Sequence, residues 1–155
     1  MGMKSIVIRQ YQMMVDTAAE SANGISQPPE GWVRTVRKAL GMSGAQLARR
    51  LGATRALVSQ TEKNELNGSI TVKNLQQMAE AMGCRFVYAI VPEGGKMEDL
   101  IAIRAKDKAR KLVEETGKHM ALEAQALSPQ QMQYEIERLQ RQMLSDMPSD
   151  LWDND

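Results

Sequence analysis

Apolar residues recur every three or four positions along most of this 155-residue chain, which is the spacing of one face of an α-helix. Glycine and proline interrupt the pattern and divide it into segments. The helical segments expected from it are residues 3–22, 32–40, 43–51, 54–63, 72–82, 97–127 and 128–144. Gly117 is a candidate interruption of the sixth segment. The pattern therefore predicts a mainly α-helical protein.

The same spacing indicates which side chains face a core. In the second helical segment, those expected to face inward are Trp32, Val33, Val36 and Leu40. By contrast, the acidic end of the chain from Ser145 contains Pro148 and is interpreted as an exposed terminus. This terminus would carry Leu151 and Trp152 on the surface, although a tryptophan there could also anchor a contact.

Residues 84–92 depart from the helical pattern. They are rich in β-branched and aromatic residues, alternate imperfectly and end at Pro92, which predicts a β-strand. A lone strand has no partner for its backbone groups, and the same strand of a second copy would supply one. We therefore favour a homodimer, with pairing to another protein or a short extended run under the core as alternatives. The residues expected at the dimer contact are Phe86, Val87, Tyr88 and Ile90.

Residues 43–63 have the features of two short helices joined by a tight turn. Ser43 and Thr54 can cap the two helices, because a hydroxyl oxygen accepts hydrogen bonds from unpaired first-turn N–H groups. Gly52 lies between the helices, where a sharp turn needs a positive φ. The second helix offers polar side chains suited to base edges and phosphates. This arrangement predicts a helix-turn-helix motif whose second helix enters a DNA groove.

Positive charge is concentrated on the same part of the chain. Residues 31–63 carry seven Lys and Arg and one acidic residue, whereas residues 64–155 carry eleven Lys and Arg and fifteen acidic residues. A segment of this kind attracts a polyanion through counterion release, so its affinity for DNA falls as salt rises. The charge distribution supports double-stranded DNA as the partner.

Individual side chains can be matched to DNA groups. Arg55 and Gln60 suit base contacts, because a guanidinium matches guanine and a carboxamide matches adenine. Two copies would place these helices about 34 Å apart on a pseudo-palindromic operator. Those better suited to phosphates are Ser43, Thr54, Ser59, Lys63 and Asn64. The full set of expected DNA contacts is Ser43, Gln46, Thr54, Arg55, Ala56, Ser59, Gln60, Lys63 and Asn64.

The residues from Trp32 to Asn64 resemble the Cro/repressor-type helix-turn-helix family. The resemblance implies a five-helix domain in which the opening residues of the second motif helix, together with Gln60, face bases. It also implies a structural pair of Arg37 and Glu62 that braces the domain without reading DNA. Many members have a glutamine at the start of the first motif helix, where this chain has Gly44. A phosphate contact there would use a backbone N–H.

A longer resemblance covers about residues 30–127. It is carried by GWVRTVRKALGMSGAQLARRLG, VSQTEKNE, GSIT and LQQMAEAMGCRFVYAIVP, followed by a charged helical tail. In this order the segments resemble the group named mobile mystery protein A, whose members are encoded beside a Fic-domain protein. The resemblance implies an antitoxin that binds this AMP-transferring Fic-domain toxin and represses their shared promoter. Residues 26–31 match the Ser/Thr-x-x-x-Glu-Gly/Asn pattern of Fic inhibitors, but their two prolines favour a linker.

The expected architecture is mainly α, with a five-helix repressor-type helix-turn-helix domain, one β-strand paired across a dimer, and helical extensions at both ends. Residues 1–30 would form an N-terminal helix and linker, and residues 31–83 the DNA-binding domain. Residues 84–92 would form the dimerisation strand, and residues 93–155 a helical extension with an acidic tail.

Composition argues against an enzyme. Cys84 and His119 are the single cysteine and histidine, and neither has catalytic or metal-ligand partners at suitable spacing. We expect no cofactor and no metal. One cysteine and no long apolar run favour a soluble bacterial cytoplasmic protein, associated with the nucleoid when bound to DNA. Two alternatives remain: a protein that mainly sequesters a partner through residues 1–22 and 97–155, and a plain regulator that binds no toxin.

Overall fold

The computed structural model describes residues 2–123 and 126–154. Its helices are α1 (Met3–Ala22), α2 (Trp32–Ala39), α3 (Gly44–Leu51), α4 (Arg55–Asn67), α5 (Val72–Ala81), α6 (Met97–Leu122) and α7 (Pro129–Asp146). The prediction of a mainly helical protein is confirmed. The interruption expected at Gly117 is absent, because α6 continues through it to Leu122.

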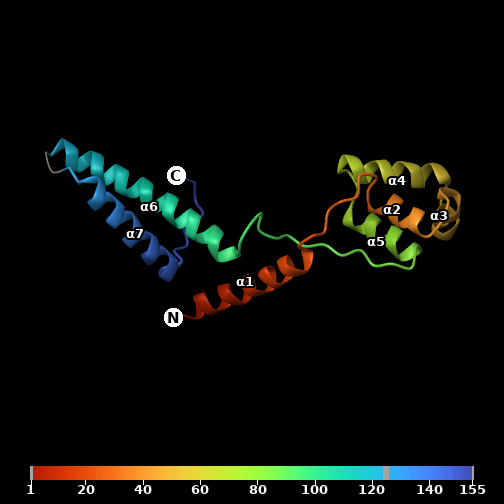
Figure 1. Ribbon diagram of the computed structural model, residues 1–155, viewed down its shortest axis with the longest axis horizontal. Helices are drawn as coiled ribbons and strands as arrows, with labels where there is room; N and C mark the ends of the chain where they lie inside the picture. Colours follow the sequence, from red (N-terminus) through yellow and green to blue (C-terminus); the bar gives the residue numbers. More distant parts are fainter. Residues whose placement is uncertain (1, 124–125, 155) are drawn as a thin grey trace. The chain divides into compact units, whose positions relative to one another are not determined.

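The chain divides into two compact units, which we name by their helices. The four-helix unit, Gly24–Tyr88, contains α2 to α5. The hairpin unit, Met1–Asn23 together with Ala89–Asp155, contains α1, α6 and α7. Figure 1 shows α2 to α5 gathered into one bundle, and α6 and α7 lying side by side as an antiparallel pair.

The core of the four-helix unit comes from one apolar stripe on each helix. Its buried residues are Val33, Leu47, Ala48, Val58, Met78 and Met82. Hydroxyl caps fix where three of the helices begin: Ser43 precedes α3, Thr54 precedes α4 and Thr71 precedes α5, each accepting a first-turn N–H. Trp32 and Leu40 were expected in this core, but 40% and 52% of their surfaces are exposed. The prediction was wrong because α2 is only eight residues long and these two residues lie at its ends, Trp32 as its first residue and Leu40 as its C-cap.

Helix α2 has an unusual cap. Its N-cap residue, Gly31, has no side chain, and the carboxylate of Glu65 on α4 takes over this role. The backbone N–H groups of Trp32 and Val33 donate to Glu65 oxygens at 2.6 and 2.9 Å. Gly31 has φ 84°, and a Cβ there would lie 2.9 Å from the Glu65 carboxyl carbon. The glycine therefore lets a carboxylate from another helix reach the start of α2.

The hairpin unit is built around a row of small and branched residues on α6. Ile101, Ala105, Ala109 and Val113 are buried at four-residue spacing, which keeps them on one face of the helix. On α7, Ile136 and Met143 pack against this row. The alanines allow the two helix backbones to approach closely, because they place only a methyl group between them.

The end of the chain packs onto the same core, contrary to the prediction of an exposed terminus. Leu151 is 1% exposed and joins the buried cluster of the hairpin unit, whereas Trp152 lies on the surface. Arg104 on α6 donates to the carbonyl of Leu151 at 2.6 Å, and Lys108 donates to the carbonyl of Asp150. The local acidic composition gave no sign of this anchoring, because the partners lie on α6.

The β-strand expected at residues 84–92 is not present, and no strand occurs elsewhere in the described part of the chain. A strand is defined by its hydrogen bonds to a neighbouring strand, and no described segment of this single chain provides one. Phe86 and Tyr88 instead stack their rings, with centroids 5.8 Å apart. The expected fifth helix of the DNA-binding domain is also missing, since Gly24–Tyr88 contains four.

Candidate nucleic-acid interface

Helices α3 and α4 meet through a tight turn at Gly52. Gly52 ends α3 in the left-handed conformation, with φ 66°, and Thr54 begins α4 with a side-chain oxygen that accepts from the N–H of Leu57 at 3.1 Å. At the other end of α3, Ser43 and Gln46 form a reciprocal capping box. The turn and the caps together determine where α4 starts and in which direction it runs.

Helix α4 has two faces of different character. The residues that face the core are Val58, Thr61, Glu62 and Glu65. The opposite face is exposed and carries Arg55, Ala56, Ser59, Gln60 and Lys63. These five are among the side chains that the sequence assigned to DNA, and the structure brings them together on one continuous surface. The exposed caps Ser43 and Thr54, with Gln46, lie at the starts of the two motif helices.

Arg37 and Glu62 brace α4 against α2. The Nε of Arg37 donates to a Glu62 oxygen at 2.7 Å, and its Nη2 donates to the other oxygen at 3.3 Å. Nη1 of Arg37 also donates to the carbonyl of Met42 at 3.0 Å. The side chains are only 14% and 11% exposed, so this pair lies in the interior of the four-helix unit.

Several other cations of the four-helix unit are already paired. Lys38 and Arg34 contact Glu30 at 2.9 and 3.9 Å, and the hydrogen bond from Lys38 lowers the pKa of Glu30 below its usual value of 4.5. Arg50 donates to the carbonyl of Ala81 at 2.6 Å, at the C-terminal end of α5 where a helix attracts positive charge. Lys38, Arg34 and Arg50 thus already have partners within the chain.

The remaining cations lie where a polyanion could reach them. Arg55 and Lys63 on α4 are exposed and form no ion pair with any residue of 2–123 or 126–154. The four-helix unit carries nine Lys and Arg against four acidic residues, and internal contacts occupy three of those acids, Glu30, Glu62 and Glu65. The four-helix unit therefore has an excess of positive charge that its own acidic residues do not neutralise.

Sequence reasoning missed two functional supports, Glu65 and Arg50. Both join residues more than thirty positions apart, so no local pattern indicates them. One signal was available for the first: Gly31 precedes a helix without offering a capping side chain, which implies that another residue caps it.

Comparison with known families bears on the four-helix unit. Residues 33–88 match the family model described as Helix-turn-helix. This segment is similar to helix-turn-helix domains. This match supports a DNA-binding transcriptional regulator and does not extend to the hairpin unit. No match was found among curated proteins or among solved structures.

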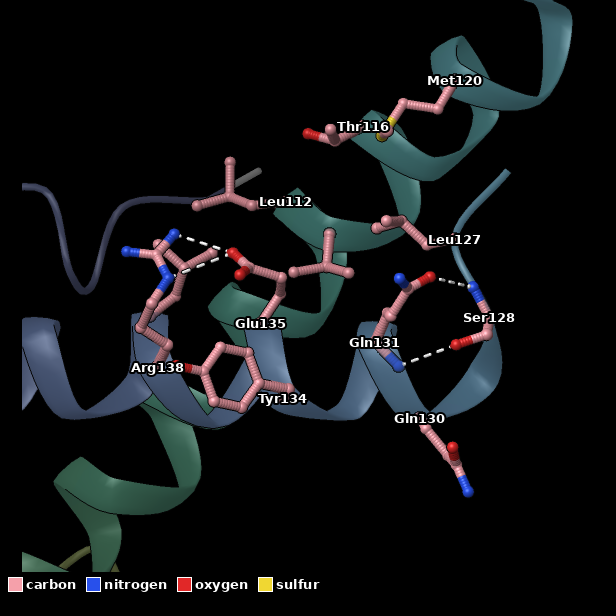
Figure 2. A pocket seen from close by; sticks show the side chains of 12 residues that line it. Leu112, Thr116, Met120, Leu127, Ser128, Gln130, Gln131, Tyr134, Glu135 and Arg138 are labelled. Carbon is pink, nitrogen blue, oxygen red and sulfur yellow. Dashed lines mark hydrogen bonds and ion pairs between the residues drawn. The ribbon is translucent and has the colours of Figure 1, made fainter. Parts of the chain in front are cut away.

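The hairpin unit has a groove of about 800 Å³ between the C-terminal part of α6 and the N-terminal part of α7. Figure 2 shows its wall: the capping box of Ser128 and Gln131 opens α7, and Glu135 is bonded to Arg138 one turn further on. The bond from Arg138, at 2.8 Å, lowers the pKa of Glu135. Leucine side chains and Tyr134 line much of the rest, so the groove is largely apolar.

No cluster of three or more metal-binding side chains occurs in the described ranges. Within those ranges, no helix combines the length and the apolar character that crossing a membrane requires. Cys84 and His119 both lie exposed on the surface. Of the expected dimer residues, Val87, Tyr88 and Ile90 are exposed, and Phe86 is half-buried.

Proposed function

We propose that the protein is a sequence-specific DNA-binding repressor whose helix α4 lies in the major groove. The observation that carries this proposal is the division of α4 into two faces. One face is anchored to the domain by Glu62 and Glu65, and the other presents exposed Arg55 and Lys63 that lack ion-pair partners among the described residues. A major groove about 12 Å wide admits such a helix.

The exposed side chains suggest separate roles in this complex. Arg55 would bind guanine, Gln60 would bind adenine, and Ala56 would contact a thymine methyl group. Ser59 and Lys63 would contact phosphates. Ser43 and Thr54 can also donate to phosphates while they cap their helices, because capping uses the hydroxyl oxygen as acceptor and leaves its proton free. Gln46 caps through its oxygen and retains its amide hydrogens for the same purpose.

Two copies of the protein would bind adjacent half-sites about 34 Å apart. The surface that best suits self-association is the segment after α5, where Ile90 is 92% exposed and Val87 and Tyr88 lie largely on the surface beside Phe86. A second copy would cover these apolar side chains and supply partners for the backbone between them.

The test is selection of bound duplexes from a random pool with the full chain, followed by affinity measurements on the selected operator. We expect Arg55→Ala to cost about 1–3 kcal/mol of binding free energy and to relax preference at one base position. Arg110→Ala, which removes an exposed arginine from α6, is the matched control and should leave affinity unchanged. Equal affinities of Arg55→Ala and the unaltered protein would contradict the placement of α4.

A second role as the antitoxin of a Fic-domain protein is favoured by one surface. Helix α1 has no buried residue, and Met3, Val7, Tyr11 and Met14 form an exposed apolar row at helical spacing. An apolar row of this kind suits a protein partner. The resemblance to mobile mystery protein A implies that this partner is a Fic-domain toxin encoded beside the protein, and that the complex represses their shared promoter.

Co-expression with that neighbouring protein, followed by purification, tests the antitoxin role. We expect a stable complex, and Val7→Glu should weaken it at least tenfold because a carboxylate would be buried against apolar surface. Gln12→Glu places the same charge on the opposite face of α1 and should have little effect. Recovery of the protein free of its neighbour would favour a plain regulator.

A further inference from the structure

A single hydrogen bond on the exposed surface of α4 joins two of the side chains assigned to DNA. The Nε2 of Gln60 donates to the Oδ1 of Asn64 at 2.9 Å. The residues are one turn apart, and a glutamine with an asparagine four positions later is a pairing that helices favour. Gln60 is exposed, whereas Asn64 is half-buried at the border of the exposed face.

The backbone at Asn64 is itself firmly held. Its carbonyl accepts hydrogen bonds from the N–H groups of Ser69 and Ile70, at 2.9 and 3.2 Å, where the chain turns after α4. Asn64 is therefore a fixed support for the flexible glutamine beside it. A free glutamine loses rotamer freedom when it binds, and a side chain that is already oriented loses less.

We propose that Asn64 is a positioning residue that orients Gln60 for adenine, and that it does not act mainly as a phosphate contact. This rests on the proposed function, since it requires α4 to read DNA. An amide nitrogen carries two hydrogens. One hydrogen of Gln60 is used by Asn64, and the second, with the Gln60 oxygen, remains for the two-point contact that adenine offers through N7 and N6.

The two roles of Asn64 predict different results. A phosphate contact adds affinity for every sequence, whereas a positioning residue adds affinity only where Gln60 meets its base. Asn64→Ala should therefore lower operator affinity about 3- to 10-fold, and the loss should be confined to discrimination at one base pair. That base pair is the one at which Gln60→Ala abolishes discrimination.

The experiment is a double-mutant cycle with the full chain. Affinities of the unaltered protein, Gln60→Ala, Asn64→Ala and the double variant are measured on the selected operator and on its single-base variants. We expect the double variant to match Gln60→Ala, because Asn64 acts through Gln60. Asn64→Asp keeps an acceptor for Gln60, so it should retain the base preference even though its charge weakens binding to all sequences.

A control within the same molecule is provided by α7. Gln133 donates to Glu137 at 3.1 Å with the same four-residue spacing, outside the helix-turn-helix domain. Glu137→Ala should leave the affinity and base preference of the protein unchanged. Unfolding curves of Asn64→Ala and Glu137→Ala should both lie close to that of the unaltered protein.

Three results would overturn the inference. A uniform loss across all sequences that adds to the effect of Gln60→Ala would make Asn64 a phosphate contact. No change in Asn64→Ala would make the hydrogen bond irrelevant to recognition. Failure of the unaltered protein to select any sequence would instead overturn the proposed function itself, and this inference with it.

Discussion

The two units of the chain bury different kinds of side chain. In the four-helix unit, Thr61, Glu62 and Glu65 of α4 are buried and hydrogen-bonded, whereas the buried side chains described in the hairpin unit are all apolar. Hydrogen bonds depend on direction as well as distance, but apolar burial is non-directional. The comparison indicates that α4 is fixed in its rotation about its own axis. That rotation decides which side chains of its outer face point away from the domain.

The surfaces of the two units differ in a related way. The four-helix unit has an excess of basic residues, nine against four, and the hairpin unit has an excess of acidic ones, fifteen against eleven. Exposed apolar side chains are plentiful on α1 of the hairpin unit, while the exposed face of α4 is mainly polar. A rigid polar face suits base recognition, and an apolar face suits a protein partner.

Breaking the Arg37–Glu62 contact should destabilise the four-helix unit more than any other change considered below. Glu62→Ala leaves the nearly buried Arg37 without its carboxylate and should lower the free energy of unfolding of this unit by about 3 kcal/mol. The chain has one tryptophan in each unit, Trp32 and Trp152. Urea unfolding in a Trp152→Phe background, followed by fluorescence of Trp32, therefore reports on the four-helix unit.

The double variant Arg37→Met with Glu62→Leu separates the directional contribution of the ion pair from its contribution to stability. It replaces the ion pair with apolar side chains, which is often neutral for stability. If directional bonds fix the rotation of α4, this variant should remain folded but discriminate less between operator and mutated sequences. If the stable double variant discriminates fully, apolar packing alone fixes the rotation of α4. The buried hydrogen bonds of the four-helix unit would then have no role in DNA recognition.

How far the sequence predicted these features depended on the range of the interaction. Helices and their caps were predictable, because Ser43, Thr54 and Gly52 act within a few residues of their own positions. The Arg37–Glu62 contact followed from a family resemblance and not from local pattern. Glu65 and Arg50 were missed because their partners are distant in sequence. The prediction of a strand at residues 84–92 was wrong. Composition indicates that a segment can form a strand, but not that a second strand is present to pair with it.

The second prediction tests the apolar core of the hairpin unit. Ala109→Leu inserts a large side chain between α6 and α7 at a position with no exposed surface, and should cost about 1–3 kcal/mol of unfolding free energy. Fluorescence of Trp152 in a Trp32→Phe background measures it. Ala121→Leu, at an exposed position of α6, should change little. Weaker operator binding by Ala109→Leu would mean that the hairpin core affects α4, which the comparison does not predict.

The third prediction concerns the cap that α4 gives to α2. Glu65→Gln keeps the shape of the side chain but leaves one oxygen to accept two backbone N–H groups, so the four-helix unit should lose about 1 kcal/mol. The fluorescence of Trp32 reports directly on the start of α2, because the backbone N–H of Trp32 is one of the two donors to Glu65. Glu80→Gln, on the exposed surface of α5, is the matched control. If both variants unfold alike, the carboxylate does not act as the cap.

A weaker, pH-dependent contribution to stability should occur in both units. Glu30 in the four-helix unit is exposed and Glu135 in the hairpin unit is partly exposed, and hydrogen bonds from Lys38 and Arg138 lower their pKa values below 4.5. A carboxylate whose folded pKa is lowered stabilises the fold above its unfolded pKa, and this contribution disappears as pH falls through the folded value. Glu30→Gln and Glu135→Gln should therefore each lower the free energy of unfolding slightly at pH 7. In acid, the difference from the unaltered protein should disappear. Unfolding followed by Trp32 and Trp152 measures the two cases separately. If only one of the two variants changes the pH dependence of unfolding, the surface ion pairs of the two units contribute differently to stability.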